Sequence, residues 1–198
     1  MKLFIFVLAL LISFSSKADE APINVVKIIS FSCNVCRASE AIDPILSTEV
    51  RRRGGQFVWA PIPVAESDFL GVKERVYYAS RTLDSELSLR VKESMYKASQ
   101  DVLVPLTTFA QAHSWLTQDL LLDSETAQKI INQAQTPEGL VPLRRAFLLV
   151  KEGGISAVPS YLLIKNGKIL KSFDMTQSNI KSFSDLRDSI LAELYKKD

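Results

Sequence analysis

Two cysteines three positions apart, Cys33 and Cys36, are the only cysteines of the chain, and Asn34 and Val35 separate them. A spacing of this kind is typical of a redox pair rather than of a structural disulfide framework. The sequence around the pair predicts that Cys33 begins a helix, where unpaired backbone N–H groups and the helix dipole favour a thiolate. A lowered pKa would make Cys33 the attacking and leaving sulfur, and Cys36 the sulfur that resolves a mixed disulfide.

The segments on either side of the pair predict a strand, a helix and a second strand. An apolar run rich in β-branched residues, 23–31, favours a buried strand before Cys33. Apolar residues at helical spacing follow Cys33, with Pro44 expected to kink or interrupt that helix and Gly54 to help end it. Residues 56–64 favour a second strand, and a strand–helix–strand order implies a parallel pair.

The rest of the chain predicts a long helical block and then a return to strand. Asp84 and Asp123 are expected N-caps, and a last helix of the block is expected over 140–152 with Pro142 near its start. Asn166-Gly167 between two apolar runs indicates a hairpin, and an apolar helical face follows in 183–194. We therefore expect an α/β fold whose first and last parts, 19–66 and 150–198, form one discontinuous domain around an inserted all-helical domain, 67–149.

The loop before the hairpin, Gly153 to Pro159, is a second candidate site element. A cis Val158–Pro159 bond could expose the backbone of Val158 beside the sulfurs, where an extended substrate segment can pair with it as an added strand. The alternative is an ordinary trans proline at the start of a strand, which is the commoner form.

The first 18 residues have the pattern of a secretory signal peptide: Lys2, a short apolar run and small residues up to Ala18, near which cleavage is expected. The run is too short for a membrane span, so the mature chain is not expected to cross a membrane. A net charge of +2 with scattered basic residues does not indicate a nucleic-acid partner.

Taken in order, these features resemble the DsbA-like branch of the thioredoxin superfamily, which comprises bacterial periplasmic oxidoreductases. The resemblance covers nearly the whole mature chain and rests on 31–36 after the first strand, on the helical insertion, and on 154–160 leading to Asn166-Gly167-Lys168. It implies a thioredoxin-like fold, a Cys33–Cys36 dithiol/disulfide, a cis Pro159 and a periplasmic location. It also implies reduced or unfolded secreted proteins as substrates, a membrane redox partner, and no cofactor or metal.

The active-site dipeptide departs from the family's best-known Pro-His pair, because here it is Asn34-Val35. Without an imidazole to support the thiolate, we expect a weaker oxidant. Glu40 resembles the family's acidic residue on the first helix, whereas Lys27 stands where an acidic residue is often found on the first strand. These two residues could pair and tune Cys36, or be two solvated surface charges.

The sequence bears on several functions other than disulfide exchange. Zinc binding and haem attachment are disfavoured, because His113 is the only histidine and Arg37, not histidine, follows Cys36. An isomerase or reductase, and a non-catalytic binding module with an inert structural disulfide, remain open alternatives. An apolar set in the helical block, Phe69, Val72, Val76 and Tyr77, could form an exposed substrate patch, although its helical spacing favours core packing.

Overall fold

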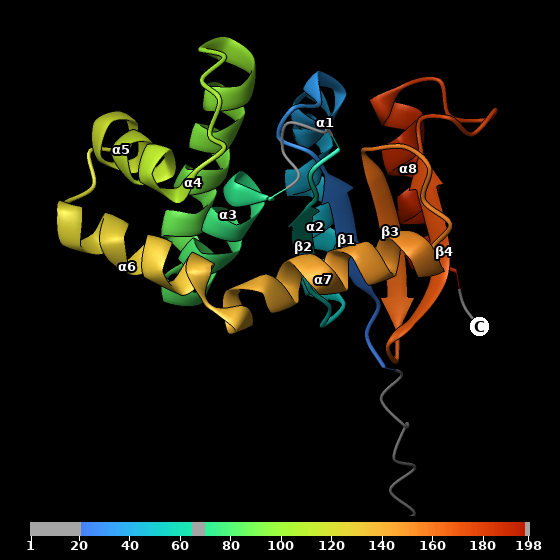
Figure 1. Cartoon of the computed structure of the whole chain (residues 1–198). Helices are drawn as coiled ribbons and strands as arrows, with labels where there is room; N and C mark the ends of the chain where they lie inside the picture. The colour runs from blue at the N-terminus through green and yellow to red at the C-terminus, as the bar shows by residue number, and fades with distance from the viewer. Residues whose placement is uncertain (1–20, 65–69, 197–198) are drawn as a thin grey trace, which may run out of the picture.

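A four-stranded mixed sheet forms the centre of the computed structural model, which describes residues 21–64 and 70–196 (Figure 1). The strand order is β2-β1-β3-β4, so β2 is an edge strand; β1 pairs in parallel with β2, while β1–β3 and β3–β4 are antiparallel. The parallel pair predicted from the strand–helix–strand order is confirmed. The strands are β1 (Asn24–Ile29), β2 (Phe57–Pro61), β3 (Ser160–Lys165) and β4 (Lys168–Asp174).

Both faces of the sheet are covered by helices. Alternating side chains of β1 point to opposite faces, so Val25 joins an apolar cluster with α2 (Asp43–Arg52) and α8 (Phe183–Leu194). Ile28 belongs to the larger cluster, which continues into the helical part of the chain. Helix α7 (Pro137–Glu152) runs from the helical part across this second face of the sheet (Figure 1).

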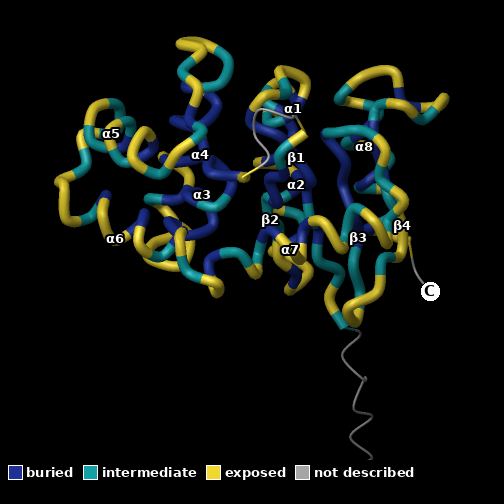
Figure 2. The backbone as a smooth tube through the Cα atoms, in the orientation of Figure 1, coloured by how far each residue is buried: buried dark blue, intermediate teal, exposed yellow. Residues whose placement is uncertain are grey.

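The helical block lies between β2 and β3 in sequence and beside β2 in space (Figure 1). Its central helix α3 is largely buried, as Figure 2 shows, and Val72, Val76 and Tyr77 are all part of the core. The alternative that these residues form an exposed substrate patch is therefore wrong; Phe69 lies outside the described residues. The block contains α3 (Val72–Leu83), α4 (Ser85–Tyr96), the π-helical segment η3 (Lys97–Asp101), α5 (Phe109–Asp119), α6 (Ser124–Gln135) and the first part of α7.

Local sequence signals fix most helix starts. The carboxylates of Asp84 and Asp123 accept hydrogen bonds from the first turns of α4 and α6, as predicted. Helix α7 begins three residues earlier than expected, because Thr136 caps it and Pro137 occupies its first turn. Pro142, predicted near the helix start, therefore lies inside α7.

The hairpin between β3 and β4 has the predicted turn. Asn166 and Gly167 both have positive φ, 53° and 74°, which a two-residue type I′ turn requires. Asparagine and glycine tolerate this conformation better than other residues.

The predicted signal peptide, 1–18, lies outside the described residues. Among the helices that are described, none combines the length and apolar character needed to cross a membrane.

Candidate active site

Cys33 lies at the N-cap of α1 (Asn34–Ala38), immediately after β1 and a short turn. The turn is closed by a 3.1 Å hydrogen bond from the Cys33 N–H to the Ser30 carbonyl. After α1 the chain passes through a 3-10 segment, η1 (Ser39–Ile42), before α2 begins with Pro44 in its first turn. The predicted interruption at Pro44 is confirmed. Cys33, the N-cap residue, and Cys36 lie on the first turn of α1.

The Cys33 sulfur is half-buried and surrounded by hydrogen-bond donors. The Cys36 N–H lies 3.1 Å from Cys33 Sγ, and the Val35 N–H also favours the thiolate. The pKa of Cys33 is lowered from the ordinary 9.0 to about 6, chiefly because the Cys36 thiol donates a hydrogen bond to it, with burial acting in the opposite direction. A thiol with this pKa is mostly thiolate at neutral pH.

Cys36 is fully buried, and its pKa is raised well above the ordinary value. The hydrogen bond to Cys33 is the main cause, because it holds the proton on Cys36, and burial adds to it. The two thiols are free in this structure, so it describes the dithiol form. The pair is chemically asymmetric: one accessible nucleophile and one protonated, buried partner.

The loop before β3 contacts the N-terminus of α1, where Val158 lies next to Cys33. The Val158–Pro159 bond is cis, and the Val158 carbonyl lies 3.6 Å from Cys33 Sγ, within hydrogen-bonding range of its thiol. Pro159 is buried, whereas Val158 is half-buried. The loop is held by a 2.6 Å hydrogen bond from the Ser160 hydroxyl to the Ala157 carbonyl. Two segments 125 residues apart in sequence therefore meet at Cys33.

The side chains of Asn34 and Val35 are exposed, with Val35 48% accessible. The support for the Cys33 thiolate comes instead from backbone N–H groups and from the Cys36 thiol. A polar side chain at Val35 would have open access to solvent at this position.

A buried ion pair lies next to the cysteines, and it differs from the expected one. Lys27, fully buried, donates to both carboxylate oxygens of Asp43 at 3.0 and 2.8 Å. Glu40 pairs instead with Lys92 of α4. The suggested Lys27–Glu40 pairing is wrong, because each residue has another partner and both pairs are desolvated rather than free on the surface.

Two further donors complete the surroundings of Asp43. The Trp59 indole N–H lies 2.8 Å from one carboxylate oxygen and the Tyr161 hydroxyl 2.9 Å from the other. Burial lowers the pKa of Lys27, and its positive charge is a minor influence that favours the thiolate form of both cysteines, although the pKa of Cys36 stays raised. Burial likewise raises the pKa of Glu40.

Four residues of this site, Asp43, Trp59, Tyr161 and Lys92, were not predicted from the sequence. Two signals were available. Asp43 is seven residues, or two helical turns, after Cys36, which would place both on one face of a continuous helix. A lysine in an otherwise apolar strand also requires a buried carboxylate as partner. The contribution of Lys92, from a helix 52 residues further along the chain than Glu40, has no local signal.

The helical block also contacts the turn between β1 and α1 that carries Cys33. The Gln100 side-chain amide donates to the Phe31 carbonyl at 2.8 Å, and Asp101 forms a 2.8 Å ion pair with Arg37. The turn that presents Cys33 is thus attached to η3 on one side and to the Val158 loop on the other.

No cluster of candidate metal ligands occurs within residues 21–64 and 70–196. His113 lies half-buried in α5, outside the cysteine site.

Comparisons with known proteins identify the fold. No protein-family model matches the sequence, and no curated protein is similar to it at a significant level. Solved structures do match over most of their length. DsbA of Pseudomonas aeruginosa has a TM-score of 0.68 at 17% identity, covering 89% of this chain and 88% of its own.

Two further structures are similar in the same way. The disulfide oxidoreductase DsbA of Proteus mirabilis has a TM-score of 0.65 at 14% identity, over 87% of this chain and 88% of its own. SrgA of Salmonella enterica serovar Typhimurium has a TM-score of 0.63 at 16% identity, over 88% and 91%. The chain therefore has the DsbA-like form of the thioredoxin fold, with the helical insertion that the sequence predicts.

Proposed function

We propose that the chain is an exported thiol:disulfide oxidoreductase that donates disulfides to secreted proteins through Cys33 and Cys36. The observation that carries the proposal is the environment of Cys33: a half-buried sulfur with a pKa of about 6, paired with a buried, protonated Cys36. An inert structural bridge needs no such asymmetry. The likeness to DsbA structures supports the fold on which this chemistry is known.

The proposed reaction begins with the oxidised Cys33–Cys36 pair. A substrate thiolate attacks Cys33 Sγ, the Cys33–Cys36 bond breaks, and Cys36 leaves and takes up a proton. A second thiolate of the substrate then attacks the substrate sulfur of the mixed disulfide, and Cys33 leaves as a thiolate. Two electrons pass from the substrate to the pair, and the low pKa of Cys33 favours its departure.

The substrate segment in this proposal pairs with the backbone at Val158. Its carbonyl, 3.6 Å from Cys33 Sγ, lies where an extended chain carrying a sulfur to Cys33 would pass. The proposal needs no cofactor; a membrane redox partner, inferred from the resemblance, would reoxidise the pair, and the predicted signal peptide would deliver the protein to the periplasm.

The redox potential tests the proposal directly. A thiolate stabilised by one pKa unit corresponds to about 30 mV in a two-electron couple, and stabilising the dithiol form makes the pair more oxidising. Thioredoxin has a pKa near 7 and a potential of about −270 mV, and DsbA about 3.5 and −120 mV. A pKa of about 6 for Cys33 therefore predicts a potential of about −240 to −195 mV.

The measurement equilibrates mature protein with glutathione buffers of graded potential and quantifies the Cys33–Cys36 disulfide, with Cys33→Ala as the control. A potential in the predicted range supports disulfide donation with weaker oxidising power than DsbA. A value below about −300 mV would contradict the proposal, because such a disulfide is too stable to donate and suits a reductase or a structural bridge.

A further inference from the structure

The outer edge of β2 has free backbone hydrogen-bonding groups. The Gln56 carbonyl accepts from the Val25 N–H of β1 at 2.8 Å, and in a parallel ladder alternate residues face the same neighbour. Phe57 and Trp59 therefore direct their N–H and C=O groups away from β1. Within the described residues, no hydrogen bond reaches these four groups.

The free edge is short and has a defined end. Pro61 has no N–H, and its carbonyl accepts a 3.0 Å hydrogen bond from the Tyr78 hydroxyl. An added strand can pair only with the Phe57–Trp59 stretch, which suits a short extended segment.

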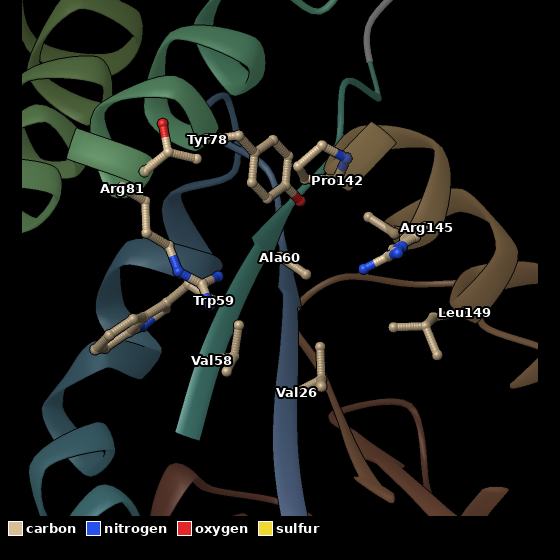
Figure 3. A pocket seen from close by; sticks show the side chains of 11 residues that line it. Val26, Val58, Trp59, Ala60, Tyr78, Arg81, Pro142, Arg145 and Leu149 are labelled. Carbon is tan, nitrogen blue, oxygen red and sulfur yellow. The ribbon is translucent and has the colours of Figure 1, made fainter. Parts of the chain in front are cut away.

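A hollow of about 470 Å³ lies on one side of this edge (Figure 3). Its floor is formed by Val26, Val58 and Ala60, three apolar side chains of β1 and β2 on the face toward α7. Arg81 of α3 and Arg145 of α7 stand on opposite sides of this hollow, as Figure 3 shows. Its volume falls within the range of about 300–1,000 Å³ typical of ligand pockets.

A second hollow, of about 520 Å³, lies on the other side of the same edge. Phe57, Tyr77 and Leu89 supply apolar surface there. Trp59 and Arg81 line both hollows, so the two flank the free edge of β2 as one trough. Alternate side chains of a strand added to β2 would point into one hollow and then the other.

The trough is positively charged. Among the described residues that line it are three arginines, Arg51, Arg81 and Arg145, and one carboxylate, that of Glu86. In the part of the chain that the structure describes, none of these three arginines forms an ion pair with a carboxylate. An acidic side chain between Arg81 and Arg145 would receive charge-assisted hydrogen bonds from both sides.

We propose that this trough binds an extended segment of a partner protein as a strand added to β2, without any reaction at a cysteine. The acidic side chains of that segment would point toward Arg81 and Arg145, and its apolar side chains toward Phe57. Helices α3, α4 and α7 wall the trough, so a slender chain fits it better than the sheet edge of a second copy. The site does not involve the thiols, so it goes beyond the proposed function and can fail independently of it.

The test uses a synthetic peptide, acetyl-Thr-Glu-Val-Glu-Val-Glu-Thr-amide, and the mature protein labelled with ¹⁵N. A titration followed by NMR should give saturable shifts at Phe57 and Trp59 and slow the hydrogen exchange of their amides. The matched peptide with lysine in place of glutamate should bind at least about tenfold more weakly, because its charges repel the arginines.

Matched variants locate the site. Arg145→Glu should weaken binding about tenfold or more, whereas Arg144→Glu, at the neighbouring exposed position outside both hollows, should change it less than about twofold. Equal effects of the two variants, no binding at about 1 mM peptide, or shifts confined to the cysteine site would overturn the proposal. Protection of Phe57 and Trp59 that rises with protein concentration alone would also overturn it, in favour of pairing between two copies.

Discussion

Removing the Cys36 thiol should raise the pKa of Cys33. The hydrogen bond from Cys36 is the largest of the effects that lower this pKa to about 6. The Cys36→Ala variant removes the donor thiol but keeps the Cys36 and Val35 N–H groups, which remain available to the thiolate.

The size of the shift follows from the strength of one hydrogen bond to a charged group. Such a bond contributes about 1.5–3 kcal/mol, which corresponds to about 1–2 pKa units. A rise of the Cys33 pKa from about 6 to about 7–8 would lower the thiolate fraction at pH 6 from about one half to about 1–10%. Alkylation at that pH should slow roughly 5- to 50-fold.

The assay measures the rate of iodoacetamide alkylation of the reduced protein from about pH 4 to 10, with the ultraviolet absorbance of the thiolate as a second readout. Val35→Ala is the matched control, since it changes an exposed side chain of the same turn and leaves every donor in place. The reasoning would be refuted by a wild-type midpoint near the ordinary cysteine value, or by a Cys36→Ala midpoint that stays near that of Val35→Ala.

Three further predictions concern the same region. The pKa of Cys33 in the folded state, about 6, lies below the ordinary 9.0. The unfolding free energy of the reduced protein should therefore increase as pH rises from 6 toward 9, and this gain should be lost as pH falls through 6. Urea denaturation should show the gain in the wild type and not in Cys33→Ala. Asp43→Ala leaves the Lys27 cation buried without a partner and should lower the unfolding free energy by about 3–5 kcal/mol. Trp59→Phe removes only one donor to Asp43 and should lower it by about 1–2 kcal/mol. Equal losses in the two variants would contradict the view that the carboxylate is needed to stabilise the buried Lys27 cation. Val35→His places an imidazole beside the thiolate and should raise the redox potential by about 30 mV for each unit by which the Cys33 pKa falls, measured by glutathione equilibration, and an unchanged or lower potential would contradict it.

Sequence patterns predicted the features that depend on nearby residues. The apolar run before Cys33, the caps at Asp84 and Asp123, and the Asn166-Gly167 turn each depend on a few adjacent positions, and each is found in the structure. The start of α7 was placed too late because the 140–152 apolar pattern outweighed the capping signal of Thr136.

The ion pairs could not be assigned in the same way. Lys27, Glu40, Asp43 and Lys92 offer two possible pairings of opposite charges, and the position of Lys92 on α4 beside Glu40 of η1 decides between them. Trp59 and Tyr161 reach Asp43 from strands on either side of β1, which places them by register rather than by sequence proximity.

The attachment of the cysteine turn to η3 limits how far this protein can be trimmed. A shortened version that joined β2 directly to β3 would retain every strand and both cysteines. It would nevertheless lose Gln100 and Asp101, and the carbonyl of Phe31 and the guanidinium of Arg37 would lose their partners. A minimal version of this chain therefore requires replacements for those two anchors, because the inserted helices are part of what holds the turn with Cys33 in place.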